Sequence, residues 1–157
     1  MKRPVLTTLL TLLLATALPA LADRMPLPAN TPTSFKDECG SCHMAFQPAL
    51  LSATDWQRTM ASLKDHFGTD ATLDPKTEQE IGAFLQRNAG NAWKLGAGGE
   101  PPRITRTERF IRKHREVAPR YWSDPRIKTA ANCESCHKGA AQGNFSEHDI
   151  AIRELRR

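Results

Sequence analysis

The four cysteines of the 157-residue chain form two pairs, and a histidine directly follows each pair. The two segments read Cys39-Gly40-Ser41-Cys42-His43 and Cys133-Glu134-Ser135-Cys136-His137. In a helical turn, residues three positions apart lie on one side, so each pair can present both thiols to the same group. Two such thiols can add across the vinyl groups of a haem, and the adjoining histidine can bind its iron. The doubled pattern therefore predicts two covalent c-type haem sites, here called haem 1 and haem 2.

Two other readings of a Cys-x-x-Cys pair fit less well. A redox-active disulfide does not need a histidine after the second cysteine in both copies. Structural zinc sites usually separate their cysteine pairs by about 15–20 residues, whereas about 90 residues lie between Cys42 and Cys133. We therefore favour haem over both a zinc scaffold and a redox disulfide.

Each haem iron needs a second axial ligand or leaves an open coordination position. Beside the two motif histidines, His43 and His137, the chain has His66, His114 and His148. His114 lies three and four positions after apolar residues, so it shares their helical face and is our candidate for haem 2. His66 lies at the border of an apolar helical face, near the end of the predicted helix that follows the first motif, and is our candidate for haem 1. His148 stands in a polar segment and is only a reserve candidate.

Methionine is the other common axial partner and raises the reduction potential. Met44 adjoins His43 and cannot reach around the haem. Met60 competes with His66, but its spacing from Trp56 and Leu63 fits a core position better. We therefore expect two bis-histidine haems with comparatively low potentials.

Helices must position these groups, because no alternation of apolar and polar residues is long enough to predict a strand. We expect one helix around 36–46 that carries the first motif. A second should begin at the capping box Thr54–Gln57 and end at Gly68. A third should begin at Asp74, with Pro75 as its first residue. The fold class predicted is mainly α, with two small helical haem-binding domains.

The same pattern predicts the domain boundaries. Residues 23–35 are expected to be a flexible N-terminus and residues 36–90 the haem 1 domain. Residues 91–102 contain three glycines and two prolines and are the predicted linker. Residues 103–157 then form the haem 2 domain. A second capping box at Thr105–Glu108 should begin the helix that bears His114.

The first 22 residues have the layout of a secretory signal. Two basic residues precede an apolar run, and Ala20-Leu21-Ala22 suits cleavage after Ala22. A retained membrane anchor is the alternative, but the apolar run is short for a span. We expect an exported periplasmic protein whose mature chain does not span the membrane.

The motifs and their surroundings resemble the bacterial dihaem cytochrome c family. The likeness runs from about Glu38 to Ile152 and includes these segments: Phe46-Gln47-Pro48, Trp56, His66-Phe67-Gly68, Arg103-Ile104-Thr105 and Lys113-His114-Arg115. It implies two helical haem domains, the first cytochrome c-like, and distal ligation by His66 and His114. It also implies that electrons arrive from a membrane b-type cytochrome and pass to a soluble monohaem cytochrome. The last segment, 150–157, departs from the family pattern.

Charged residues are unevenly distributed along the chain. Residues 23–100 hold 7 basic and 10 acidic side chains, whereas residues 101–157 hold 13 basic and 7 acidic ones. Export argues against a nucleic-acid partner, and a solvated surface is the plain alternative for the basic stretch 103–120. We expect this stretch to orient an acidic redox partner.

The function that follows is electron transfer rather than catalysis, because six-coordinate iron has no vacant site. The alternative is a dihaem peroxidase or a gas-binding cytochrome, and it would require one open iron.

Overall fold

The computed structural model describes residues 23–155, which form helices and turns and contain no strand. The α-helices are α1 (Thr33–Cys39), α2 (Ala53–Ala61), α3 (Pro75–Arg87), α4 (Ala92–Leu95), α5 (Glu108–Lys113) and α6 (Pro119–Trp122). Short 3-10 helices join or follow them: η2 (Pro48–Leu50), η3 (Leu63–Asp65), η4 (Ile104–Arg106), η5 (Cys133–Ser135), η6 (Ala140–Gln142), η7 (Glu147–Asp149) and η8 (Arg153–Leu155). The prediction of a mainly helical fold is confirmed.

The predicted signal peptide, residues 1–22, lies outside the described residues. Within residues 23–155, none of the helices has the length and apolar character needed to cross a bilayer.

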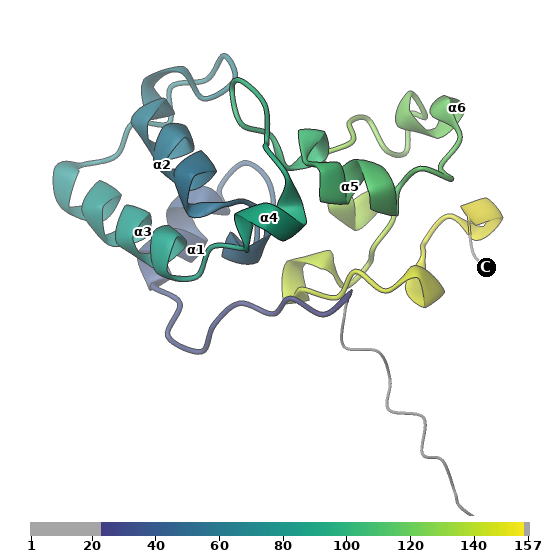
Figure 1. Cartoon of the computed structure of the whole chain (residues 1–157), viewed down its shortest axis with the longest axis horizontal. Coiled ribbons are helices and arrows are strands. Elements are labelled where there is room, and N and C mark those ends of the chain that lie inside the picture. Colours follow the sequence, from purple (N-terminus) through teal and green to yellow (C-terminus); the bar gives the residue numbers. More distant parts are fainter. Residues whose placement is uncertain (1–22, 156–157) are drawn as a thin grey trace, which may run out of the picture.

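The first half is built around α1, α2 and α3, which lie together at one end of the molecule (Figure 1). Their apolar faces meet in one buried cluster: Phe35, Leu51, Trp56, Ile81, Phe84 and Leu85. The rings of Phe35 and Phe84 lie 4.9 Å apart at its centre. Cys39 of the first motif packs against this cluster, so the first predicted haem-attachment segment lies against the larger of the two cores.

The second half has a smaller core and mostly short turns. Its buried cluster contains Tyr121, Ile127, Ile150 and Ile152, and Cys136 of the second motif packs against it. A core of this size buries little apolar surface for the chain it must hold. A large apolar group bound in this half would supply the missing contacts.

Helix ends explain where the sequence-based boundaries shift. Asp74 caps α3 as predicted, and its carboxylate accepts from the Lys76 and Thr77 amides. For α2, however, Ser52 is the cap, and its hydroxyl accepts from the Asp55 amide at 3.1 Å. The capping box at 54–57 therefore lies inside the helix. Likewise Thr107, and not Thr105, caps α5.

Neither cysteine motif lies within a long helix. α1 ends at Cys39, so the rest of the first motif forms a turn instead of continuing a helix to residue 46. The second motif begins in the single 3-10 turn η5. Each motif thus starts at a helix end, where the backbone is free to turn its side chains toward one group.

The segment predicted as a linker, residues 91–102, is folded onto its neighbours. It contains α4, and Leu95 is 4 % exposed. The Gly98 amide donates to the buried Asp55 carboxylate at 3.2 Å. The N-terminal stretch also has partners, because Met25 N donates to Gly143 O at 2.7 Å and Phe145 N donates to Asp23 O at 2.9 Å. Figure 1 shows this stretch running from the second half back to α1. The division into two domains remains a prediction.

Candidate functional site

The first candidate pair of ligands is His43 and His66. Their ring centroids lie 6.3 Å apart, with 32° between the ring planes. The His43 Nδ1 lies 2.8 Å from the Met44 carbonyl, so Nδ1 carries the proton and donates it. This leaves the lone pair on Nε2 available for a metal. His43 also packs on Phe46, with centroids 4.9 Å apart.

A tight turn presents His66. Its amide donates to Thr69 O at 2.8 Å, and the Thr69 amide donates back to His66 O at 3.2 Å. Phe67 at the turn has φ of 55°, a left-handed conformation that non-glycine residues seldom adopt. The structure therefore holds His66 in one place at some cost in backbone strain.

The second candidate pair is His114 and His137, with ring centroids 6.1 Å apart and planes at 87°. The His114 Nδ1 donates to the Phe110 carbonyl at 2.8 Å, which again leaves Nε2 free. Phe110 stacks on the His114 ring with centroids 4.0 Å apart, and Trp122 meets its edge at 5.9 Å. Two aromatic side chains thus fix the plane of this imidazole.

The spacing within both pairs fits a single metal ion between two imidazoles. Metal–imidazole bonds are about 2 Å long and a ring nitrogen lies about 1.1 Å from its ring centre, so opposed ligands have centroids about 6.2 Å apart. The observed distances are 6.3 Å and 6.1 Å. The remaining candidates lie elsewhere: Met60 packs against the first core, and His148 is exposed.

Burial keeps three of these histidines in the neutral form that binds metal. Burial lowers the pKa of His66 most, and the nearby His43 and Arg103 lower it further. Burial also lowers the pKa of His114, and Lys113 adds to this, while the hydrogen bond to Phe110 acts in the opposite direction. For His137, burial and nearby His114 lower the pKa. At neutral pH these rings therefore carry a lone pair and no positive charge.

The cysteines do not have the properties of a redox disulfide centre. All four are free thiols. Burial, with a smaller effect of Glu38, raises the pKa of Cys39 to about 11, and burial raises the pKa of Cys133 to about 11. Reactive Cys-x-x-Cys pairs instead have a lowered thiol pKa. Zinc fits no better, because the described residues contain no group of three or more metal-binding side chains.

The second site also has room for a large apolar cofactor. A cavity of about 330 Å³ is bordered by both motif cysteines and both histidines of this half. Its apolar walls include Phe110, Trp122, Ile127 and Ile150. The buried Nδ1 of His137 has no hydrogen-bond partner in the protein. Apolar walls, two thiols and two neutral imidazoles together suit an iron porphyrin held by thioether bonds.

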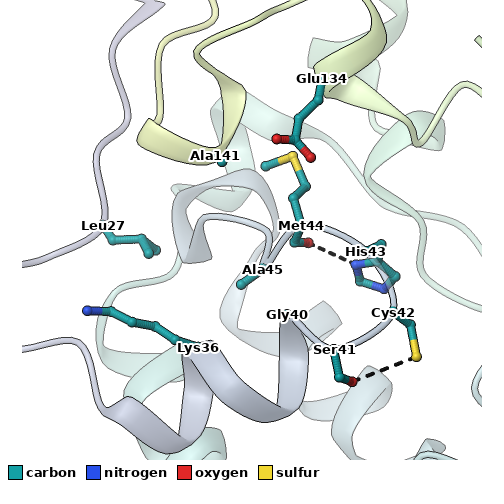
Figure 2. A pocket seen from close by; sticks show the side chains of 10 residues that line it. All are labelled: Leu27, Lys36, Gly40, Ser41, Cys42, His43, Met44, Ala45, Glu134 and Ala141. Carbon is teal, nitrogen blue, oxygen red and sulfur yellow. Dashed lines mark hydrogen bonds between the residues drawn. The ribbon is translucent and has the colours of Figure 1, made fainter.

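A second cavity, of about 440 Å³, links the two motifs (Figure 2). Cys42 and His43 of the first motif and the next residue, Met44, border it on one side, and Glu134 of the second motif and Ala141 of η6 border it on the other. In Figure 2 the Met44 and Glu134 side chains point toward each other. The two attachment segments therefore face the same space.

The structure brings together each predicted cysteine motif and its predicted distal histidine. The assignments of Cys39, Cys42, Cys133 and Cys136 as attachment residues and of the four histidines as ligands remain predictions. Sequence reasoning did not identify Trp122, which lay in a stretch without clear periodicity. It placed Arg103 in the basic stretch 103–120 but did not predict that its guanidinium lies 4.0 Å from the Phe67 ring centre, beside His66.

Comparisons with known proteins agree with this geometry. The family model described as dihaem cytochrome c matches residues 35–145. No curated protein matches the chain. A dihaem cytochrome c structure from Rhodobacter sphaeroides is similar, with 37% identity, a TM-score of 0.65, and coverage of 76% of this chain and 99% of that one. Another from Shewanella baltica OS155 shows 35% identity and a TM-score of 0.68, over 78% of this chain and 94% of that one.

A second structure from Rhodobacter sphaeroides, of a protein named DHC, shares 39% identity over 73% of this chain and 97% of that one, with a TM-score of 0.63. The family match spans both cysteine motifs, and the similar structures cover most of both chains. The chain belongs to the dihaem cytochrome c family and carries two covalently bound haem c groups.

Proposed function

We propose that this protein is an exported electron carrier in which both haem irons have two histidine ligands. Haem 1 is bound by Cys39 and Cys42 and ligated by His43 and His66. Haem 2 is bound by Cys133 and Cys136 and ligated by His137 and His114. The haems supply reversible one-electron chemistry, and the chain supplies their attachment, ligands and surroundings.

One observation carries this proposal: each motif histidine faces a second histidine at the separation that one metal ion requires. With a histidine on each side, a bound iron porphyrin would have no open position, so a substrate or gas would have to displace one of the two histidines. Electron transfer would need no such displacement. We therefore favour a carrier over an enzyme.

The proposed setting is the periplasm, after cleavage of residues 1–22. There the protein would receive electrons from a membrane b-type cytochrome and deliver them to a soluble monohaem cytochrome. The basic stretch 103–120 would orient an acidic partner, because complementary charge chiefly raises the association rate. Several of its side chains already have partners: Arg106 donates to Glu100 O, Lys113 pairs with Asp23, and Arg115 pairs with Glu116.

Optical and EPR spectra of the purified holoprotein test this proposal. We expect two low-spin ferric haems, no methionine–iron charge-transfer band, and no change in the ferrous spectrum with carbon monoxide. A high-spin component that binds carbon monoxide would refute the six-coordinate assignment. It would favour the alternative, a peroxidase or gas-binding cytochrome.

Single variants identify the ligand at each haem. His114→Ala should convert haem 2 to a high-spin form that binds carbon monoxide, and His66→Ala should do the same at haem 1. His148→Ala is the matched control, because this histidine is exposed and its removal should leave both haems low-spin. A wild-type spectrum in either distal variant would contradict that assignment.

A further inference from the structure

The segments that follow the two cysteine motifs are joined by one buried side chain. Gln47 follows His43 by four positions, and Ala140 follows His137 by three. The Gln47 Nε2 donates to Ala140 O at 2.8 Å and lies 3.4 Å from Ala141 O. Gln47 is 1% exposed and Ala140 is 0% exposed. This contact therefore joins the two haem-attachment segments inside the protein.

The orientation of the Gln47 amide follows from its neighbours. Both backbone atoms beside it are carbonyl oxygens, so only the NH₂ end can face them. Its Oε1 is buried and has no partner. An unpaired buried acceptor costs free energy that an apolar side chain of the same length would avoid. Filling space therefore does not explain a glutamine here, whereas donation to Ala140 does.

Gln47 is anchored on both sides of this contact. Its carbonyl accepts from Leu50 N at 3.0 Å, and the next carbonyl, of Pro48, accepts from the Trp56 ring at 2.8 Å. On the other side, Ala140 N donates to His137 O at 2.9 Å. A continuous set of short, mostly buried contacts thus runs from the first core to the proximal histidine of haem 2.

We propose that Gln47 is a positioning residue that fixes the separation of the two haems and so sets the rate at which they exchange an electron. It acts through the loops that carry the haems and does not ligate iron. The proposal rests on the ligand assignments given above. It adds that the two haems work as one unit because Gln47 holds their attachment segments together across the shared cavity.

The variant Gln47→Met tests the proposal in the holoprotein, because it keeps the length of the side chain and removes the donor. Ala140 O keeps a second partner, Gly143 N at 2.8 Å, whereas the part-buried Ala141 O loses its 3.4 Å contact with Gln47. We expect both haems to stay low-spin and haem content to match the parent. We expect hydrogen exchange of residues 139–144 to speed up about fivefold, as for the loss of one hydrogen bond.

The decisive readouts are the magnetic dipolar interaction between the two ferric haems, measured by EPR, and the electron-exchange rate in half-reduced protein. Both should change in Gln47→Met. Gln57→Met is the matched control, because Gln57 donates to Gln86 at 3.1 Å on the exposed surface. If Gln47→Met leaves the dipolar interaction and the exchange rate as in Gln57→Met, the proposal is wrong, whatever happens to stability.

Gln47→Glu gives an independent test that also serves if the methionine variant fails to mature. A protonated carboxyl can donate to Ala140 O and a carboxylate cannot, and burial raises the pKa of such a group. We expect parent-like haem interaction at about pH 5 and a changed interaction at about pH 9, because a buried carboxyl can titrate between them. An interaction that does not vary with pH in this variant would also overturn the proposal. Loss of low-spin character in the parent itself would instead refute the proposed function.

Discussion

Arg103 places a positive charge beside the distal ligand proposed for haem 1. Its guanidinium lies 4.0 Å from the centre of the Phe67 ring, and that ring lies 4.8 Å from the His66 ring. The same charge helps to lower the pKa of His66, after burial and His43. A nearby positive charge favours ferrous over ferric iron. Arg103→Gln should therefore lower the reduction potential of haem 1.

The size of the shift follows from these distances. The guanidinium lies within about 9 Å of the His66 ring, where a unit charge contributes about 0.5 kcal/mol in bulk water and about 1.8 kcal/mol at an effective dielectric constant near 20. Arg103 is exposed, so the value should lie toward the water limit. With about 59 mV per tenfold change for one electron, we expect haem 1 to fall by about 20–40 mV.

A potentiometric titration that resolves the two haems measures this shift. Haem 2 should move by much less, because the charge lies beside the ligand of haem 1. Arg103→Lys keeps the charge and should move haem 1 less than Arg103→Gln does. Arg87→Gln, at the exposed end of α3, removes the same net charge elsewhere. Equal shifts of both haems, or equal effects of Arg103→Gln and Arg87→Gln, would refute the local-charge explanation.

Three further perturbations test the surroundings of the haems. Burial lowers the pKa of His114 from its ordinary value of 6.5, and the proposed bond to iron would exclude a proton from its Nε2 as well. The unfolded chain therefore binds more protons at acid pH, and the unfolding free energy should fall as pH drops below 6.5; a denaturation series that is flat from neutral to acid pH would contradict this. Gly143→Ala should cost about 2 kcal/mol or more, because φ is 75° and the new Cβ would lie 2.1 Å from Met25 O, whereas Gly82→Ala, with nothing within 4 Å, should not destabilise the fold. Trp56→Phe removes a 2.8 Å hydrogen bond to the turn after the first motif and should cost about 1–2 kcal/mol in the same assay.

The spacing of apolar residues was enough to predict a helix whose cap and buried face lie within one short stretch of sequence, as in α3. Ile81, Phe84 and Leu85 recur on one face of α3, and all three are buried as expected. Asp74 and Pro75 also begin this helix where their capping chemistry predicts. In such an element the signals of cap, face and length lie within a short stretch, so the sequence alone determines it.

Contacts between distant segments could not be read in this way. The glycines and prolines of 91–102 favoured an open linker, but Leu95 and Gly98 are buried, and the Gly98 amide donates to Asp55, 43 positions earlier. Gln47 is a polar residue in a turn, and nothing local indicates that it reaches a carbonyl 93 positions later. Such contacts depend on how the two halves of the chain pack together, and no local sequence pattern predicts that packing.

The two proposed distal histidines show how a residue can be chosen for an incomplete reason. His114 was selected because it shares an apolar helical face, yet in the structure it is the C-cap of α5, outside the regular helix. There the Phe110 carbonyl accepts both the His114 amide at 3.0 Å and the ring Nδ1 at 2.8 Å. Within a longer helix the Phe110 carbonyl would accept only the backbone N–H of residue 114.

His66 also lies at the end of a helix, but a different turn holds it. It is the C-cap of the short turn η3, and the Asp65 carboxylate accepts from the Gly68 amide at 2.9 Å to close the turn around it. Both proposed ligands thus stand just beyond a helix end, where the backbone no longer dictates the direction of the side chain. A mid-helix histidine on the same apolar face would be held to the helical direction. If these histidines ligate iron as proposed, the position of a helix end, more than the apolar face, is what makes each of them available.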